Sequence, residues 1–581
     1  MSPTTRTCAG LFLLGCLLCV PGILFDRFPF PDVAERYVLM AEEFAAGHWD
    51  RAFHPRFPPL TPALGGLIAS TGMPAFAAIK SASAFWFAFG AIAVFLLQRR
   101  VFGEPTALWA AMLYLLCSRL LRLGPSGLLD PGKTAFFALA AYGLVRFAQS
   151  KDRGSVLIVA LGAAGVAIAR PEAVLQSLML LAVMAGLEAS AAWRKTGKEG
   201  TGTLCPQHTS GASHKRYLSP FSTLSKTLAT TGLFCVLLLP WLAYTTLQTG
   251  YPVTASRQIP VVKRLEAALG LDLQIRAPRL PEYASPTFPL PVDTSIAEPP
   301  TESTTTAGPT RPSRMLANAT PESIWTWMIV ETGEGMYPPY TLFVVVAMII
   351  RRRRGTWSGA ETILLTLFIA HSLLVVLSLM AMGSIWVEER YVAAASPLLF
   401  GWAAWAIRGS IAQLSDRGQM AKWAVHALVV LVVAGLLFDG WRRLRPSLRP
   451  EKQAMQQAEI ECGRWLKTHA AMESHAGRPR LPSDWYNYHA GGRPILICEE
   501  ATVQFLSGGD AVNTDVLGRV DDFRSFVALC KALDVDYVVV SPRLVRRFPF
   551  LRSHERLSPY FRPAFVKWKD AVQYRYILAR S

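Results

Sequence analysis

Blocks of apolar residues about as long as a bilayer is thick recur along most of this 581-residue chain. An α-helix needs about 20 predominantly apolar residues to cross the hydrocarbon core, where nothing but the helix itself can satisfy the backbone. The sequence therefore predicts a multispanning α-helical membrane protein with about eleven transmembrane helices. The blocks lie near residues 8–25, 74–98, 105–123, 133–149, 155–170, 171–190, 228–247, 338–350, 360–382, 391–407 and 423–440.

Composition and charge exclude two broad classes of protein. Charged residues make up 17% of the chain and hydrophobic residues 51%, whereas a soluble domain carries about 25% charged residues. The net charge of +18 would suit a nucleic-acid binder. However, many of the Lys and Arg residues stand in short runs between apolar blocks, as the positive-inside rule describes. We therefore expect lipid, and no nucleic acid, as the surroundings of this chain.

The basic runs also predict an orientation. They occupy alternate loops, which we expect to be cytoplasmic: 99–100, 151–153, 194–226, 351–354 and 408–422. The loops that carry Asp32, Asp130 and Glu388 then lie outside. The chain is accordingly expected in a bacterial inner membrane with its site facing the periplasm, although a lumenal site in the endoplasmic reticulum would obey the same rules. One cluster, between Arg442 and Arg449, disagrees with this alternation.

Two parts of the chain are predicted from these patterns. Residues 1–440 form the membrane part, with an outer loop over 26–73 that carries an interfacial helix and a second outer loop over 249–337. Residues 278–321 in that second loop are rich in Pro, Thr and Ser and cannot bury a core. Residues 441–581 have the pattern of a small soluble α/β domain, which we expect outside and in a supporting role. Its expected elements are helices over 454–471 and 521–533 and strands over 493–498 and 537–541.

Ionisable residues in the outer loops are the candidates for chemistry. Asp32 follows the first span beside aromatic residues, where a carboxylate can act as a general base; alternatively, it caps the helix that begins near Val33. Asp130, before a proline, and Arg390, before Tyr391, fall on the same predicted face. Arg170 at an outer helix break suits a phosphate oxygen, or it is an arginine that extends to the membrane surface.

The order of these motifs resembles the GT-C superfamily of membrane glycosyltransferases. The similarity is greatest to the branch that holds the protein O-mannosyltransferases and the bacterial transferase that adds aminoarabinose to lipid A. It rests on an acid and a nearby Tyr after the first span, a Pro-Pro turn, Leu-Asp-Pro after the third span, an Arg after the fifth, a late Arg-Tyr and a soluble tail. The resemblance covers most of the membrane part and the general layout of the tail.

The resemblance implies an inverting transfer of a sugar from a polyprenyl-phosphate donor to a lipid, protein or glycan acceptor. Asp32 corresponds to the first-loop acid, but it lies five residues before Tyr37, whereas the family's acid lies four before and Val33 fills that position here. Glu35 is therefore a competing candidate. Asp130 matches the second acid, which positions the acceptor or a cation or braces the first loop.

Further roles follow from approximate motif position. In the lipid A branch a basic residue directly precedes the Pro-Pro turn, but here Phe57 holds that place and Arg56 comes one residue earlier. The expected ligands of the donor phosphate are Arg56, Arg170 and Arg390. Tyr37, His54 and Tyr391 are expected to position substrate.

Cofactors and competing functions complete the expectations. No redox cofactor is needed. The acids do not form a compact ligand cluster in the sequence, so the sequence does not decide whether a divalent cation binds. A transporter or flippase for lipid-linked glycans would use the same charges, but no second copy of the 32–62 segment is present. A glycan polymerase or ligase also works outside but has a different motif order. A noncatalytic scaffold would tolerate changes at Asp32 and Asp130.

Overall fold

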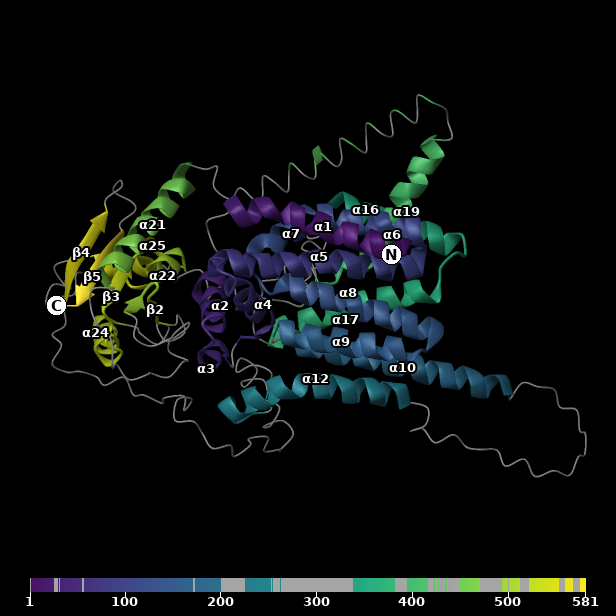
Figure 1. The fold of residues 1–581 in the computed structure, drawn as a ribbon, viewed down its shortest axis with the longest axis horizontal. Helices are drawn as coiled ribbons and strands as arrows, with labels where there is room; N and C mark the ends of the chain where they lie inside the picture. The colour runs from purple at the N-terminus through teal and green to yellow at the C-terminus, as the bar shows by residue number, and fades with distance from the viewer. Residues whose placement is uncertain are drawn as a thin grey trace, which may run out of the picture.

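The computed structural model shows a long bundle of helices with a small sheet at one end (Figure 1). Apart from isolated positions, the residues that the structure describes are 2–25, 32–54, 57–170, 173–199, 225–251, 338–381, 394–415, 450–470, 494–499, 501–512, 522–552, 560–567 and 575–580.

A helix coincides with each of the first ten apolar blocks, and the block near 423–440 falls almost wholly outside the described residues. These helices are α1 (Pro3–Phe25), α5 (Ala75–Phe102), α6 (Glu104–Leu116) with α7 (Ser118–Leu123), α8 (Asp130–Ser150), α9 (Arg153–Ala169), α10 (Val174–Glu199), α12 (Ser225–Thr249), α16 (Pro338–Arg353), α17 (Gly359–Ala381) and α19 (Ser396–Ser415).

Within the described part of the chain, five helices are long and apolar enough to cross a membrane. A sixth span forms if the pair 104–116 and 118–126 is counted as one, although it bends by 56°. The bend falls at Cys117, whose backbone is extended and interrupts the helix. A helical membrane protein is thus confirmed, and the number of about eleven spans stays a prediction.

Small residues allow these helices to pack closely. A Cβ added to Gly162 of α9 would lie 2.7 Å from the backbone nitrogen of Ala140 in α8, and one added to Gly143 would lie 2.9 Å from the nitrogen of Val159. In lipid, helices associate through such close packing because the surroundings are as apolar as the side chains. The backbones of α8 and α9 are therefore in close contact along the bundle.

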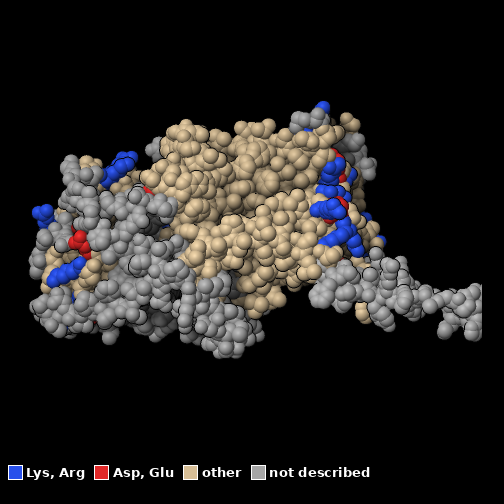
Figure 2. Space-filling model, turned by 60° about the horizontal axis from the view of Figure 1, so that its bottom comes forward, with Lys and Arg blue, Asp and Glu red and all other residues tan. Residues whose placement is uncertain are grey.

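A cluster of Lys and Arg residues lies at one end of the bundle, which we call the basic end, and further Lys and Arg residues lie on the C-terminal part (Figure 2). Arg99 pairs with Glu104 at 3.1 Å, Gln149 Nε2 donates to the carbonyl of Arg100, and Lys226 Nζ donates to the carbonyl of Lys151. These contacts join the ends of α5, α6, α8 and α12. The described residues 99–100, 151 and 226, in loops expected to be cytoplasmic, thus lie at one end of the molecule.

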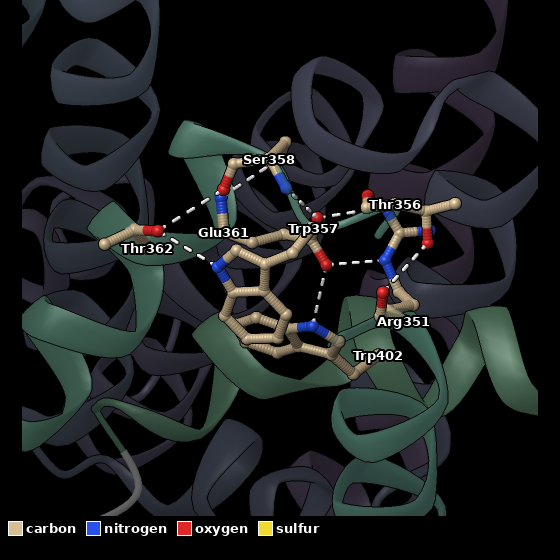
Figure 3. Close-up of polar contacts among 7 residues, drawn as sticks. All are labelled: Arg351, Thr356, Trp357, Ser358, Glu361, Thr362 and Trp402. Atoms are coloured by element: carbon tan, nitrogen blue, oxygen red, sulfur yellow. Dashed lines mark hydrogen bonds and ion pairs between the residues drawn. The ribbon is translucent and has the colours of Figure 1, made fainter. Parts of the chain in front are cut away.

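A buried carboxylate ties three helices together at the basic end. Glu361, fully buried in the first turn of α17, accepts hydrogen bonds from Arg351 Nε at 2.6 Å and Nη2 at 2.9 Å, and from Trp402 Nε1 at 3.0 Å (Figure 3). The backbone N–H of Ser358 donates to the same carboxylate at 2.8 Å. The rings of Trp357 and Trp402 stack 5.7 Å apart beside it. This network fixes α16 and α19 to the start of α17.

Substitution of Glu361 by Gln should destabilise the bundle strongly. Removing one partner of a buried ion pair costs about 3–5 kcal/mol because the other charge is left without compensation. We expect a loss of that size in the free energy of unfolding, measured by denaturant titration in detergent. Glu104→Gln breaks an exposed pair and should cost at most about 1 kcal/mol. Equal losses in the two variants would contradict the role of Glu361.

Asp152, in the turn between α8 and α9, gives the basic end a pH dependence. Hydrogen bonds from Ser150, Arg146 and the backbone N–H of Ser155 lower the pKa of Asp152 to about 2. Because the folded pKa lies below the unfolded one, this stabilisation is present above about pH 4 and is lost as the pH falls toward 2. Asp152→Asn should therefore lower the melting temperature at neutral pH, and the difference from wild type should shrink between pH 4 and 2. A difference that is constant over this range would contradict the assignment.

The opposite end of the bundle, which we call the outer end, is built from short elements. They lie where α5 and α8 begin and where α9 ends, and Figure 1 shows α2, α3 and α4 there. They are η1 (Val33–Tyr37), α2 (Val38–Ala45), α3 (Trp49–Ala52), α4 (Leu60–Ala69) and η2 (Gly124–Ser126).

The C-terminal part folds around a five-stranded sheet of order β2-β1-β3-β5-β4, parallel among the first three strands and antiparallel among the others. Helices α21 and α22 pack on one face through Cys462 and Val503, and α24 packs on the other through Phe526. The four elements expected from sequence coincide with α21, β1, α24 and β3. The elements are α21 (Pro450–Ala470), β1 (Ile495–Ile497), α22 (Ala501–Ser507), β2 (Asp510–Ala511), α24 (Phe523–Ala532), β3 (Tyr537–Val540), α25 (Pro542–Arg547), η7 (Pro549–Arg552), β4 (Phe561–Lys567) and β5 (Arg575–Arg580).

Candidate active site

Asp32 stands at the start of η1, a single turn of π-helix. Its carboxylate makes no capping hydrogen bond to the backbone. Instead, Arg36 Nη1 donates to Asp32 Oδ1 at 3.1 Å, across the four-residue spacing that places two side chains on one helix face. Asp32 thus holds the N-cap position that the alternative interpretation expected, but its side chain pairs with Arg36 and does not cap the backbone. Its side chain is 30% exposed, so the acid lies at the boundary between protein and solvent.

Phe57 connects this acid to the Pro-Pro turn. The guanidinium of Arg36 lies 4.5 Å from the centre of the Phe57 ring, and the rings of Tyr37 and His54 lie 6.3 and 5.0 Å from it. Phe57 is buried, as are Tyr37 and His54. The structure thus brings Asp32 together with two of the residues expected to position substrate. The position that is basic in the lipid A branch holds an aromatic ring under Arg36.

A buried ion pair joins the second acid to an arginine. Arg170 Nη1 donates to Asp130 Oδ1 at 2.5 Å, and the side chains are only 10% and 2% exposed. Asp130 is the first residue of α8, and Arg170 directly follows α9, so the pair closes the outer end of these two packed helices. Arg170 is therefore not an arginine that extends to the membrane surface. The structure places it beside an acid, and contact with donor phosphate stays a prediction.

The loop before Asp130 packs against η1. Gly127 has a φ of +79°, and a Cβ there would lie 2.9 Å from Val33 Cγ1, so glycine is required on both grounds. Ser83 Oγ lies within hydrogen-bond distance of the carbonyls of Leu123 and Leu128, at 3.3 and 3.2 Å, and holds the loop to α5. The segments that carry the two acids are consequently in contact. Glu35 lies in the same turn of π-helix, but its side chain is outside what the structure describes.

Three buried cations at this end were not singled out from the sequence. Lys80 and Lys133 are each 1% exposed, and Lys80 Nζ donates to the carbonyl of Ile23 at 3.1 Å and lies 4.8 Å from the Phe76 ring. Arg36 is the third. The sequence did carry a signal for each of them, because a lysine within an apolar block is costly and Arg36 follows Asp32 by four residues. The outer end therefore holds buried cations in addition to Arg170.

Three further candidates, Arg56, Arg390 and Tyr391, lie outside the described residues. Within the part of the chain that the structure describes, no group of three or more His, Cys, Asp or Glu side chains is arranged to hold a metal ion. The described site is therefore one of carboxylates, guanidinium and ammonium groups, suited to proton transfer and to binding an anion.

Comparison with known proteins finds one matching family and several solved structures of similar fold. Residues 55–204 match the family described as dolichyl-phosphate-mannose-protein mannosyltransferase. Crystal structures of ArnT from Cupriavidus metallidurans share the fold: the apo form matches with a TM-score of 0.55 at 13% identity, over 100% of this chain and 98% of that one. The form bound to undecaprenyl phosphate gives 0.54 at 12% identity, with the same coverage of both chains.

The resemblance to GT-C membrane glycosyltransferases is confirmed. An oligosaccharyltransferase from Archaeoglobus fulgidus also matches, with a TM-score of 0.47 and 11% identity, over 99% of this chain and 74% of that one. No curated protein matches the sequence. The similarity to the ArnT structures extends over the whole chain and therefore concerns the overall fold.

The Asp130–Arg170 pair can be tested for separate structural and functional roles. Asp130→Asn alone should lower the free energy of unfolding by about 3–5 kcal/mol, because it removes the counter-charge of a buried guanidinium. Adding Arg170→Gln removes that charge and should restore much of the stability, as measured by denaturant titration in detergent. Transfer activity should stay low in both variants. A double variant that regains wild-type activity would show that the pair serves stability alone.

Proposed function

We propose that this chain is an inverting glycosyltransferase that moves a sugar from a polyprenyl-phosphate donor to a lipid, protein or glycan acceptor at the outer end of the bundle. The observation that carries the proposal is the contact between two acid-bearing segments, with Asp32 paired to Arg36 and Asp130 paired to Arg170. The fold shared with ArnT, one structure of which holds undecaprenyl phosphate, supports this type of donor.

The environments of the two acids suit different tasks. In a single displacement, the acceptor oxygen bonds to the anomeric carbon while the bond from that carbon to the phosphate oxygen breaks. The lipid phosphate leaves with the electron pair, and the acceptor proton passes to a base. Asp32, partly exposed, can receive that proton, and Glu35 competes for the role. Asp130, enclosed in its ion pair, is suited to hold the acceptor or to brace the first loop.

Charge on the departing phosphate requires cations that are already in place. Arg170 is the described candidate that the sequence predicted, and it would share its guanidinium between Asp130 and the phosphate. Lys133 lies one turn after Asp130 in α8 and is a second buried cation at this end of the bundle. Arg56 and Arg390 remain candidates from the family motifs.

The side of the membrane follows from the charge pattern. By the positive-inside rule the basic end is cytoplasmic, so the outer end faces the opposite compartment. We infer a bacterial inner membrane with the site, and the C-terminal part at residues 441–581, in the periplasm. Transport of a lipid-linked glycan and polymerase or ligase activity are the competing functions, and they would not give single-sugar transfer.

The test is transfer by purified protein in lipid nanodiscs, with a panel of radiolabelled polyprenyl-phosphate sugars and envelope extract as acceptor. Removing a general base lowers the rate by about 10²–10⁴-fold. We expect a loss in that range for either Asp32→Asn or Glu35→Gln, and a loss for Asp130→Asn. Glu104→Gln, at the basic end, is the matched control and should keep wild-type activity. If no donor is consumed, or if all three acid variants match wild type, the proposal is wrong.

A further inference from the structure

The C-terminal part of the chain contacts the helix that carries the first acid. Helix α22 packs directly against η1, although more than 450 residues separate them in the sequence. Figure 1 shows α22 between the sheet and the end of the bundle at which α2 lies. The short helix therefore has the sheet domain on one side and the acid-bearing turn on the other.

The turn that α22 contacts is unusually enclosed for a helix in an outer loop. Val33 and Ala34 are fully buried, and Arg36 and Tyr37 are 8% and 7% exposed. The loop at Gly127 accounts for the burial of Val33, and Phe57 for one side of Arg36 and Tyr37. A π-helical turn is rare, and such turns occur frequently at functional sites. Contacts on several sides explain how this geometry persists.

Gln504 lies on a different side of α22 from the residues that pack on α21. Val503 and Leu506 face α21, because a Cβ on Gly463 would lie 2.6 Å from Leu506 Cβ and 3.1 Å from the carbonyl oxygen of Val503. At 3.6 residues per turn, Gln504 points roughly 100–160° away from those two. It is nevertheless only 2% exposed, and its amide Nε2 has no hydrogen-bond partner among the residues that the structure describes. The buried Gln504 side chain is therefore packed within the protein on a side of α22 other than the one that meets α21.

We propose that α22 is a positioning element of the active site, with Gln504 as its central residue, which holds η1 so that Asp32 is aimed at the acceptor. The C-terminal domain then contributes to catalysis through η1, without contacting the reacting atoms. This inference rests on the proposed glycosyltransferase function. It assigns the domain a role that neither the sheet nor the sequence of the domain suggests by itself.

The test combines turnover with hydrogen exchange of the whole protein in nanodiscs. Gln504→Lys places a charge in the buried contact and should speed exchange of the backbone amides of residues 33–37. Because small displacements of a catalytic group reduce the rate steeply, kcat should fall by about tenfold or more while KM for the lipid-linked sugar changes less than about twofold. Gln504→Glu, of the same shape, is the milder variant if the Lys variant does not fold.

Two controls separate positioning from domain stability. Gln504→Met keeps the side-chain volume and should stay near wild type in both readouts. Val527→Ala empties part of the core on the opposite face of the sheet, away from η1, and should lower domain stability without changing kcat or exchange at 33–37. The proposal is overturned if Val527→Ala reproduces the Gln504→Lys effects, or if folded Gln504→Lys or Gln504→Glu protein matches wild type. A wild-type protein without transfer activity would refute the proposed function. The exchange data would still show whether α22 holds η1 in place.

Discussion

The buried ion pair between Asp130 and Arg170 determines how the outer end of this molecule is arranged. It joins the first residue of α8 to the residue that follows α9, two helices whose backbones approach closely at Gly143 and Gly162. Irregular backbone at the end of a membrane bundle is stable only where protein satisfies its polar groups. The pair fixes where α8 begins, and the loop from 124 to 129 is in turn held against α5 by Ser83.

From that fixed loop the arrangement extends to the first acid and then to the C-terminal part. Gly127 packs on Val33, Arg36 joins Asp32 to the ring of Phe57, and α22 contacts the same turn of π-helix. Along this route the buried charges of Asp130, Arg170 and Arg36 have partners, as low-polarity surroundings require. At the other end, Glu361 does the same for α16, α17 and α19, so both ends of the bundle depend on buried carboxylates.

Much of the fold could be predicted because its signals are local. The length of an apolar block predicts a helix, and ten of the blocks coincide with described helices; in the tail, the short apolar runs near 495 and 537 are strands. Asp130 and Asp32 were recognised because charge next to apolar blocks is costly. The pairing of Asp130 with Arg170 was not predicted, because the two residues are 40 positions apart. Arg170 was interpreted as a phosphate ligand or a surface arginine. The contact of α22 with η1 depends on the tertiary fold, and no local pattern encodes it. The bend at Cys117 was also missed, because an apolar run does not reveal a single extended residue.

Photochemical labelling tests the central claim most directly, namely that a polyprenyl-phosphate donor binds at the outer end beside the two acids. A polyprenyl phosphate with a photoreactive group next to the phosphate would be activated with the protein in nanodiscs, and the labelled peptides identified by mass spectrometry. The account predicts labels in peptides around residues 124–136 and 166–174 and in the Pro-Pro turn, suppressed by excess unlabelled lipid phosphate. Labels confined to the basic end, or spread evenly over the lipid-facing helices without competition, would contradict it.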